Sequence, residues 1–342
     1  MSDIDSLAPP LDPASGDGDQ GGDIISLRIC VPPMCNGWRL DHFLKWRIGR
    51  LSRTRIQAVV AEQITFADGR RVRSASRVRV GEIVHLDRPA PVEPDVPRYF
   101  SVIAEDEHYL AIEKPAGLPM HATAKFWKNT LTAVLRERYP DERMQICHRL
   151  DRETSGVLLV ARTAQAASFL MKAFENRKVQ KSYLALVHGH LDPAHGTVDA
   201  PMKLVESRTH MMMGIMPDGM HARTRYTTLE QYPAHALILA EPETGRQHQI
   251  RLHCAHLGHP IVGDKMYKAS EADFMAYCDG GMTPELQAKF DHLPRHALHA
   301  HKLVFPHPIT REMTTIQSPL PADLGAYIDS TCAPLRATGD CS

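Results

Sequence analysis

The sequence predicts an α+β protein in which a small mixed module precedes a large domain, built on a mainly antiparallel mixed sheet with peripheral helices. Three observations support this prediction. The chain has 342 residues and is 43% hydrophobic, enough for one large and one small core. Two helical patterns and then strand-like patterns occupy the chain up to residue 88, and four prolines follow between Arg88 and Arg98. Strand-like segments then dominate the rest of the chain.

The first 27 residues read as a disordered acidic tail. They are rich in Gly, Pro, Ser and Asp, with too few large apolar side chains to offset the entropy lost on ordering. The polar end at residues 333–342 gives the same expectation. No run reaches the roughly 18 to 20 apolar residues of a membrane helix, and the N-terminus has no basic region followed by an apolar stretch. We therefore expect a cytoplasmic protein without membrane contact.

Residues 28–88 predict two short helices, a hairpin and a further strand. Apolar side chains recur at helical spacing from Leu40 to Leu51 and from Ile56 to Val60, and Ser52 and Thr54 are both possible caps of the second helix. Asp68-Gly69 lies between apolar runs, as a type I′ hairpin turn requires. Residues 76–86 alternate like another strand. The proline-rich residues 89–98 are expected to form an extended linker.

Residues 99–332 predict the large domain. A hairpin ending in a Pro/Gly turn is expected at 99–119, a strand at 156–162 and a helix at 163–176. Four more strands are expected at 181–191, 222–232, 235–243 and 298–308, and a helix within 246–258. The methionine-rich stretch Met211–Met220 reads as a loop and not as a cofactor site.

Charge and cysteine use narrow the function. Forty Lys and Arg balance 40 Asp and Glu over the whole chain, yet residues 38–88 hold 12 basic against five acidic residues. A phosphate backbone interacts with this local excess of positive charge and not with the net charge of the whole chain, so the segment is suited to binding nucleic acid. The seven cysteines lack paired C-x-x-C spacing and indicate reduced thiols.

One carboxylate in HRLDRETSG, His148–Gly156, raises the chemical question. Asp151 stands between arginines, with no second acid at the spacing that hydrolytic glycosidases need. A carboxylate beside a guanidinium has a depressed pKa and stays ionised at neutral pH, which suits a nucleophile or an anionic stabiliser. A single carboxylate can serve a reaction that breaks and remakes one glycosidic bond, so the pattern favours isomerisation. The alternative is an ordinary cap or surface ion pair.

HRLDRETSG resembles the signature of the RluA-type pseudouridine synthases. Five further blocks resemble that family in the same order: KPAGLPMH, KSYLALV, ARTRY, TGRQHQIRLHCAHLGHPIVGDKMY and LHAHKLVFPHP. Together with the resemblance of the small N-terminal module, given below, the likeness covers about Trp38 to Pro321. Ala122 and Lys268 depart from the proline and glycine that the family often has there.

The resemblance implies catalytic roles for Asp151, Tyr183 and Arg251. Asp151 would attack the anomeric carbon of a uridine or, in the competing scheme, remove the neighbouring sugar proton to give a glycal. Tyr183 would stack on the base and take the proton from carbon five, and Arg251 would pair with the aspartate. Arg149 would enter the RNA stack that the uridine leaves. The expected substrate-binding residues are Arg149, His148, Leu150, Arg246 and His248. No metal, nucleotide or redox cofactor is expected.

The helix, helix, hairpin order, with WRLDHFL and LSRTRIQ, resembles the small RNA-binding module first known from a small-subunit ribosomal protein, here called the S-four-type module. Gln63 departs from the glycine usual before the hairpin. The module's expected RNA-binding residues are Arg53, Arg55, Arg70, Arg71 and Arg73. Their phosphate contacts would offset the few kcal/mol that flipping a uridine costs.

Several alternatives stay open. Large-subunit ribosomal RNA is the expected partner of a monomeric enzyme, and transfer RNA is the alternative substrate. A catalytically inactive RNA-binding or ribosome-assembly factor would keep the fold without the chemistry. A zinc site could be read into His248, His253, Cys254, His256 and His259, but Gly258 and Pro260 would end a helix there and no glutamate follows a histidine.

Overall fold

The computed structural model describes residues 24–48, 52–89, 92–123, 126–208 and 211–332. The chain divides into two compact units, residues 1–92 and 93–342. Tails were expected at 1–27 and 333–342, and of these residues 1–23 and 333–342 lie outside the described residues. Within the described ranges, no helix is long and apolar enough to cross a membrane.

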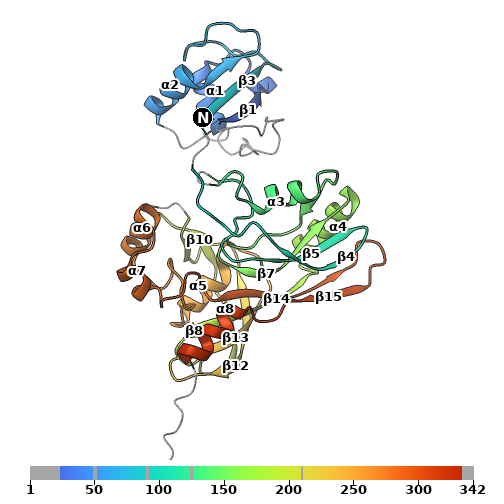
Figure 1. The fold of residues 1–342 in the computed structure, drawn as a ribbon, viewed down its shortest axis with the longest axis vertical. Helices are drawn as coiled ribbons and strands as arrows, with labels where there is room; N and C mark the ends of the chain where they lie inside the picture. The colour runs from blue at the N-terminus through green and yellow to red at the C-terminus, as the bar shows by residue number, and fades with distance from the viewer. Residues whose placement is uncertain (1–23, 49–51, 90–91, 124–125, 209–210, 333–342) are drawn as a thin grey trace, which may run out of the picture. The chain divides into compact units, whose positions relative to one another are not determined.

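The first unit is a three-stranded antiparallel sheet with two helices (Figure 1). The strand order is β1-β3-β2, and the elements are β1 (Ile24–Cys30), α1 (Leu40–Ile48), α2 (Arg53–Glu62), β2 (Ile64–Phe66) and β3 (Ile83–Pro89), with a short 3-10 turn, η2, at Pro33–Cys35. Helix α1 buries Leu40, Phe43 and Leu44, the spacing of one helical face. Ser52 caps α2 by accepting a hydrogen bond from the Arg55 backbone N–H at 3.2 Å.

Two expectations for this unit were wrong. Residues 24–27 belong to β1 and not to the tail, because the strand pairs along its whole length with β3. The type I′ hairpin does not form either. That turn needs positive φ at both central residues, and of Asp68 and Gly69 only the glycine has it, at +70°. Strand β2 instead pairs with β3, whose apolar Val84 and Leu86 are buried.

The second unit confirms the predicted α+β class. Its ten-stranded sheet has the order β4-β5-β7-β14-β8-β13-β12-β9, with β15 added beside β14 and β6 beside β7. Every pair is antiparallel except β7 with β14. The strands are β4 (Ser101–Glu105), β5 (Tyr109–Lys114), β6 (Gln145–Ile146), β7 (Ser155–Ala161), β8 (Gln180–His188), β9 (His195–Asp199), β12 (Arg223–Gln231), β13 (His235–Pro242), β14 (Leu298–Pro306) and β15 (Met313–Gln317).

Helices lie at the periphery of this sheet (Figure 1). They are α3 (Leu131–Arg138), α4 (Ala164–Glu175), α5 (Gln249–His256), α6 (Glu271–Gly280), α7 (Pro284–Lys289) and α8 (Ala322–Tyr327), followed by a π turn, η3, at Ile328–Cys332. Helix α4 packs on β7 and β14, and α5 on β12 and β13. The helices expected at 163–176 and 246–258 are confirmed as α4 and α5.

Strand β7 is buried along both faces and fixes the segment that precedes it. Val157 and Leu159 pack in the cluster under α4, while Leu158 and Val160 pack in the cluster with α3. At the start of β7, Gly156 has a φ of +112°, and a Cβ there would lie 2.2 Å from the carbonyl oxygen of Ala300 on β14. Only glycine fits this junction.

Two segments differ from their expected form. The methionine-rich stretch is not only a loop, because β10 (Met202–Leu204) and β11 (Met213–Ile215) form a small antiparallel sheet. The expected linker is partly bound to the second unit. The Glu93 carboxylate accepts hydrogen bonds from the backbone N–H groups of Lys128 (2.7 Å) and Asn129 (2.8 Å).

Candidate functional site

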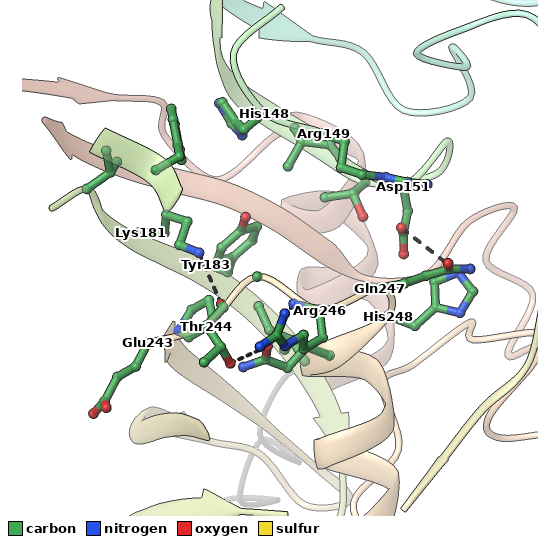
Figure 2. A pocket seen from close by; sticks show the side chains of 18 of the residues that line it. His148, Arg149, Asp151, Lys181, Tyr183, Glu243, Thr244, Arg246, Gln247 and His248 are labelled. Atoms are coloured by element: carbon green, nitrogen blue, oxygen red, sulfur yellow. Dashed lines mark hydrogen bonds and ion pairs between the residues drawn. The ribbon is translucent and has the colours of Figure 1, made fainter. Parts of the chain in front are cut away.

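A cavity of about 530 Å³ opens in the second unit (Figure 2). Three segments line it: the HRLD motif before β7, the end of α4 with the start of β8, and residues 242–251 leading into α5. Its size lies within the roughly 300 to 1,000 Å³ of small-molecule sites. The three segments come from distant parts of the sequence, so the site exists only in the folded chain.

Asp151 faces this cavity and is held by Arg251. The Arg251 Nη1 donates to Asp151 Oδ2 at 3.0 Å. The other edge of the same guanidinium binds Asp264 in two hydrogen bonds, from Nε at 2.6 Å and Nη2 at 3.0 Å. The Asp264 side chain is 0% exposed and that of Arg251 is 8%, whereas 21% of the Asp151 side chain is exposed. Of the two carboxylates that share the cation, Asp151 is therefore the one open to a ligand.

The Asp151 carboxylate is ionised at neutral pH. Burial by itself would raise its pKa, but the charge of Arg251 more than compensates, so the pKa lies below the usual value for aspartate. Burial likewise opposes ionisation of Asp264, and the Arg251 charge and hydrogen bonds overcome it and depress the pKa of that carboxyl group. The site thus holds an anion that is poorly solvated but remains charged.

A buried lysine holds the backbone around Asp151. Lys114 is 0% exposed, and its Nζ donates to the carbonyl oxygens of Pro115 (2.7 Å), Thr154 (2.9 Å) and Arg152 (3.0 Å). Burial lowers the pKa of Lys114 to about 7. The turn closes on itself as well, because the Thr154 N–H donates to the Asp151 carbonyl at 3.1 Å.

Replacing Lys114 by methionine is expected to lower the free energy of unfolding by at least about 2 kcal/mol, because buried carbonyl groups lose their donors. Urea denaturation measures the change. Lys172→Met, at an exposed position on α4, is the matched control and should stay within about 0.5 kcal/mol of the wild type. Equal stability of the two variants would contradict this role for Lys114.

The side chains of the HRLD motif, which precedes β7, serve different purposes. The His148 Nε2 accepts the Leu159 backbone N–H at 3.1 Å, and its ring stacks on Phe174 with centroids 4.6 Å apart. Leu150 is buried in the hydrophobic core, while Arg149 is exposed and lines the cavity. All four side chains line the cavity, and His148 and Leu150 also anchor the segment to β7 and the core.

His248 stands beside Asp151 in a strained backbone conformation. Its φ of 56° and ψ of 18° lie in the left-handed region, at the N-cap of α5. The ring Nδ1 is 3.0 Å from the Tyr267 hydroxyl and Nε2 is 4.0 Å from Asp151 Oδ1. Burial lowers the pKa of His248 to about 4, so the ring is neutral. Nearby, Arg246 donates from Nε to the His221 carbonyl at 3.2 Å.

Tyr183 and Lys181 present alternate side chains of β8 to the same cavity (Figure 2). Burial and the Asp151 charge raise the pKa of Tyr183, so its phenol is neutral at neutral pH. Lys181 donates to the Thr244 carbonyl at 3.1 Å. Burial and the nearby Arg177 lower the pKa of Lys181 to about 8.

The arginines expected to bind RNA in the first unit differ in their surroundings. Arg55, Arg71 and Arg73 are exposed. Arg70 instead forms ion pairs with Glu82 and with Asp68 and lies 3.9 Å over the Phe66 ring, so it serves the fold. The side chain of Arg53 lies outside the described residues. The same unit carries a cavity of about 250 Å³ lined by Arg39, Asp41, His42, Lys45 and Ile56.

Two histidines of the alternative zinc cluster, His253 and His259, are held by hydrogen-bond partners within the fold. His253 lies 2.9 Å from the Thr224 hydroxyl through Nδ1 and 3.1 Å from the Ala200 carbonyl through Nε2. The His259 Nδ1 is 2.8 Å from the carbonyl of His188. In the part of the chain that the structure describes, no three His, Cys, Asp or Glu side chains are grouped so that they could hold a metal ion.

Three groups at the site had no role assigned from the sequence. Asp264 and Lys114 lie within quoted motifs, but nothing in the local pattern shows that they contact Arg251 or the turn at Asp151. Lys265 is the third. Its Nζ binds both oxygens of Glu153, at 2.9 and 3.0 Å, in the same motif as Asp151.

Comparisons with known proteins agree on one family. Residues 108–256 match the family model described as RNA pseudouridylate synthase. An uncharacterized RNA pseudouridine synthase of Chloroflexus aurantiacus is 36% identical over 305 residues, covering 86% of this chain and 90% of that protein. The ribosomal large subunit pseudouridine synthase D of Xanthomonas campestris pv. campestris is 37% identical over 303 residues, covering 86% and 89%. The solved structure of human RNA Pseudouridylate Synthase Domain Containing 1 is similar with a TM-score of 0.53 and 28% identity, covering 67% of this chain and 86% of that one.

Proposed function

We propose, on the premise that this chain belongs to the RluA-type family of RNA pseudouridine synthases, that it isomerises uridines of large-subunit ribosomal RNA in the cavity around Asp151. The chain is an RNA pseudouridine synthase, and the choice of RNA is the proposal. One observation carries the assignment of the site: Asp151 is kept anionic by Arg251 and is still open to a cavity of nucleotide size.

The target uridine must leave the RNA stack to reach Asp151. Flipping costs a few kcal/mol and least in an unpaired loop. Arg149 is exposed and lines the cavity. We propose that its guanidinium takes the place of the flipped base in the RNA stack, since a planar guanidinium can stack on neighbouring bases. Arg246 and His248, on the opposite loop, would contact the nucleotide inside the cavity. His148 and Leu150 would hold the HRLD motif in place and so position Arg149 and Asp151.

Two routes begin from the ionised Asp151. In the first, a carboxylate oxygen attacks C1′ and the bond from C1′ to N1 breaks, releasing uracil as an anion. The base then turns, C5 attacks C1′, and the carboxylate leaves. In the second, the carboxylate removes the C2′ proton as the same bond breaks and returns it after the new bond forms. A uridine deuterated at C2′ would slow the second route and not the first.

Tyr183 is proposed to serve the last step, removal of the C5 proton. A neutral phenol can take this proton only as it gives its own to another acceptor. The base nitrogen N1 closes this balance, because N1 gains a proton in pseudouridine. The raised pKa of Tyr183 makes loss of the phenol proton demanding. Tyr183→Phe keeps the ring and removes the hydroxyl. We expect turnover to fall by about 10²-fold or more with unchanged RNA affinity. Stacking alone would instead leave the phenylalanine variant active. Quantifying pseudouridine against time separates these outcomes.

The S-four-type module, with its exposed Arg55, Arg71 and Arg73, is proposed to bind RNA phosphates and bring the catalytic domain to its target. These contacts supply affinity without reading sequence. Specificity would then come from RNA shape and from the cavity. The name of the large-subunit relative supports ribosomal RNA as the substrate of this chain. We further propose that the chain acts as a monomer in the cytoplasm.

Mapping pseudouridines across ribosomal and transfer RNA, in strains with and without the gene, tests the substrate. We expect one or more sites in large-subunit ribosomal RNA to depend on the gene. Loss of sites in transfer RNA alone would move the substrate to that class. Identical maps in both classes would overturn the proposed substrate and favour an RNA-binding factor without turnover.

A further inference from the structure

Arg177 occupies a backbone position that normally takes glycine. Helix α4 ends at Glu175, Asn176 is its C-cap, and Arg177 follows with a φ of 57°. The Lys178 N–H returns to the Ala173 carbonyl at 2.9 Å, which closes the helix end. A left-handed residue after a C-cap is usually glycine, because any Cβ is strained there. Such strain at the lining of a cavity points to a use for the side chain.

Arg177 and the neighbouring cation Lys181 have no acidic partner among the described residues. Arg177 and Lys181 both line the Asp151 cavity. Among the described residues, neither has a carboxylate within ion-pair distance, and Lys181 hydrogen-bonds only to the Thr244 carbonyl. Besides Asp151, two acids line the cavity, Glu175 and Glu243, and neither forms an ion pair with Arg177 or Lys181. Glu243 instead pairs with Arg223 and Arg225. Two like charges lie close enough for Arg177 to lower the pKa of Lys181, after the larger effect of burial. An anion placed between them would relieve this repulsion.

We propose that Arg177 and Lys181 form a subsite for one RNA backbone phosphate next to the flipped uridine. The inference rests on the proposed function. In Figure 2, Lys181 lies on the far side of Tyr183 from Asp151, so the phosphate would be held across the base from the reacting carboxylate. Arginine and the lysine ammonium are the two side chains that bind phosphate most readily, the first through paired donors and the second as a point charge.

The test compares two variants that make the same substitution at two left-handed arginines. Arg177→Gly removes the cation and suits the backbone, so the thermal midpoint should stay equal or rise. Arg311→Gly is the matched control, since Arg311 has a φ of 67° but lies over the Phe169 ring, away from the cavity. Both full-length variants are assayed on ribosomal RNA extracted from cells that lack the gene.

For Arg177→Gly we expect KM to rise about fivefold with kcat nearly unchanged. The slope of log affinity against log salt should become less steep by about 0.7 to 0.9, the value for one phosphate contact. Arg177→Lys should restore much of that slope, and Arg311→Gly should change neither quantity.

An unchanged KM and slope in Arg177→Gly would overturn the subsite, as would a lower thermal midpoint together with an equal fall in kcat and kcat/KM. A wild-type protein that forms no pseudouridine contradicts the proposed function instead. In that case the salt dependence of RNA binding, compared between the wild type and Arg177→Gly, would still test the phosphate subsite.

Discussion

Replacing Asp151 by asparagine is expected to lower the rate of pseudouridine formation by at least about 10⁴-fold. The amide has nearly the shape of the carboxylate but cannot attack C1′ or accept the C2′ proton, so both routes stop. Arg251 keeps its two hydrogen bonds to Asp264, and the fold should be retained. RNA affinity should therefore change by less than about threefold, since one polar contact in the cavity is replaced by another.

Turnover and binding are measured on ribosomal RNA from cells that lack the gene. Asp141→Asn makes the same change at an exposed position and should behave as the wild type. An Asp151→Asn variant with substantial turnover would remove the carboxylate from the reaction. A variant that no longer binds RNA would show that the residue organises the site and does not only react.

Replacing Arg251 by methionine is expected to lower the free energy of unfolding by about 3 to 5 kcal/mol at neutral pH, because a buried carboxylate loses its counter-ion. Asp264 is fully buried and shares this guanidinium with Asp151. The Met266 and Tyr267 N–H groups, at 2.9 and 3.0 Å from Asp264, are hydrogen-bond donors without a full charge and cannot replace it. Catalysis should also be lost, since the pKa of Asp151 would rise.

The effect of Arg251→Met on stability depends on pH with a defined sign. In the wild type the folded pKa of Asp264 is depressed, so its contribution is present above the unfolded pKa and is lost as the pH falls through the folded value. Without Arg251, burial should raise that pKa above the unfolded value of about 4, and stability should fall as the pH rises through this range. The gap between wild type and variant should thus widen from pH 4 to pH 7.

Urea denaturation at several pH values measures this gap. Arg143→Met, at an exposed position, is the control and should show a small gap at every pH. Arg251→Lys retains a charge but not the geometry that binds two carboxylates at once, so it should fall between the wild type and the methionine variant. A constant gap for Arg251→Met would contradict the proposed electrostatic role.

The sequence predicted the parts of the fold that depend on short-range pattern. Apolar patterns marked strands β7, β8, β12, β13 and β14, and the helical spacing of apolar residues from Thr163 to Asn176 marked α4, because each of these elements packs one or both faces in the core. Helix α6 buries no residue and so has no apolar stripe to recognise. Strand β1 was missed because the acidic, glycine-rich composition before it extended the expected tail by four residues.

The site was predicted only as far as the family resemblance reached. The resemblance predicted that Arg251 pairs with Asp151, and Arg251 Nη1 donates to Asp151 Oδ2 at 3.0 Å. Neither Asp264 nor Lys114 could be assigned, since their roles come from contacts between segments that are distant in sequence. The strain at Arg177 was equally hidden, because the left-handed φ of a non-glycine residue is a property of the helix end and not of its composition. Buried polar networks must be read from coordinates.

The most direct measurement of the central claim is complementation of a deletion strain, followed by quantification of pseudouridine in its large-subunit ribosomal RNA. Wild-type protein should restore every gene-dependent pseudouridine, while the Asp151→Asn protein, expressed to the same level, should restore none. Restoration by the asparagine variant would show that an ionised side chain at position 151 is not what isomerises the uridine.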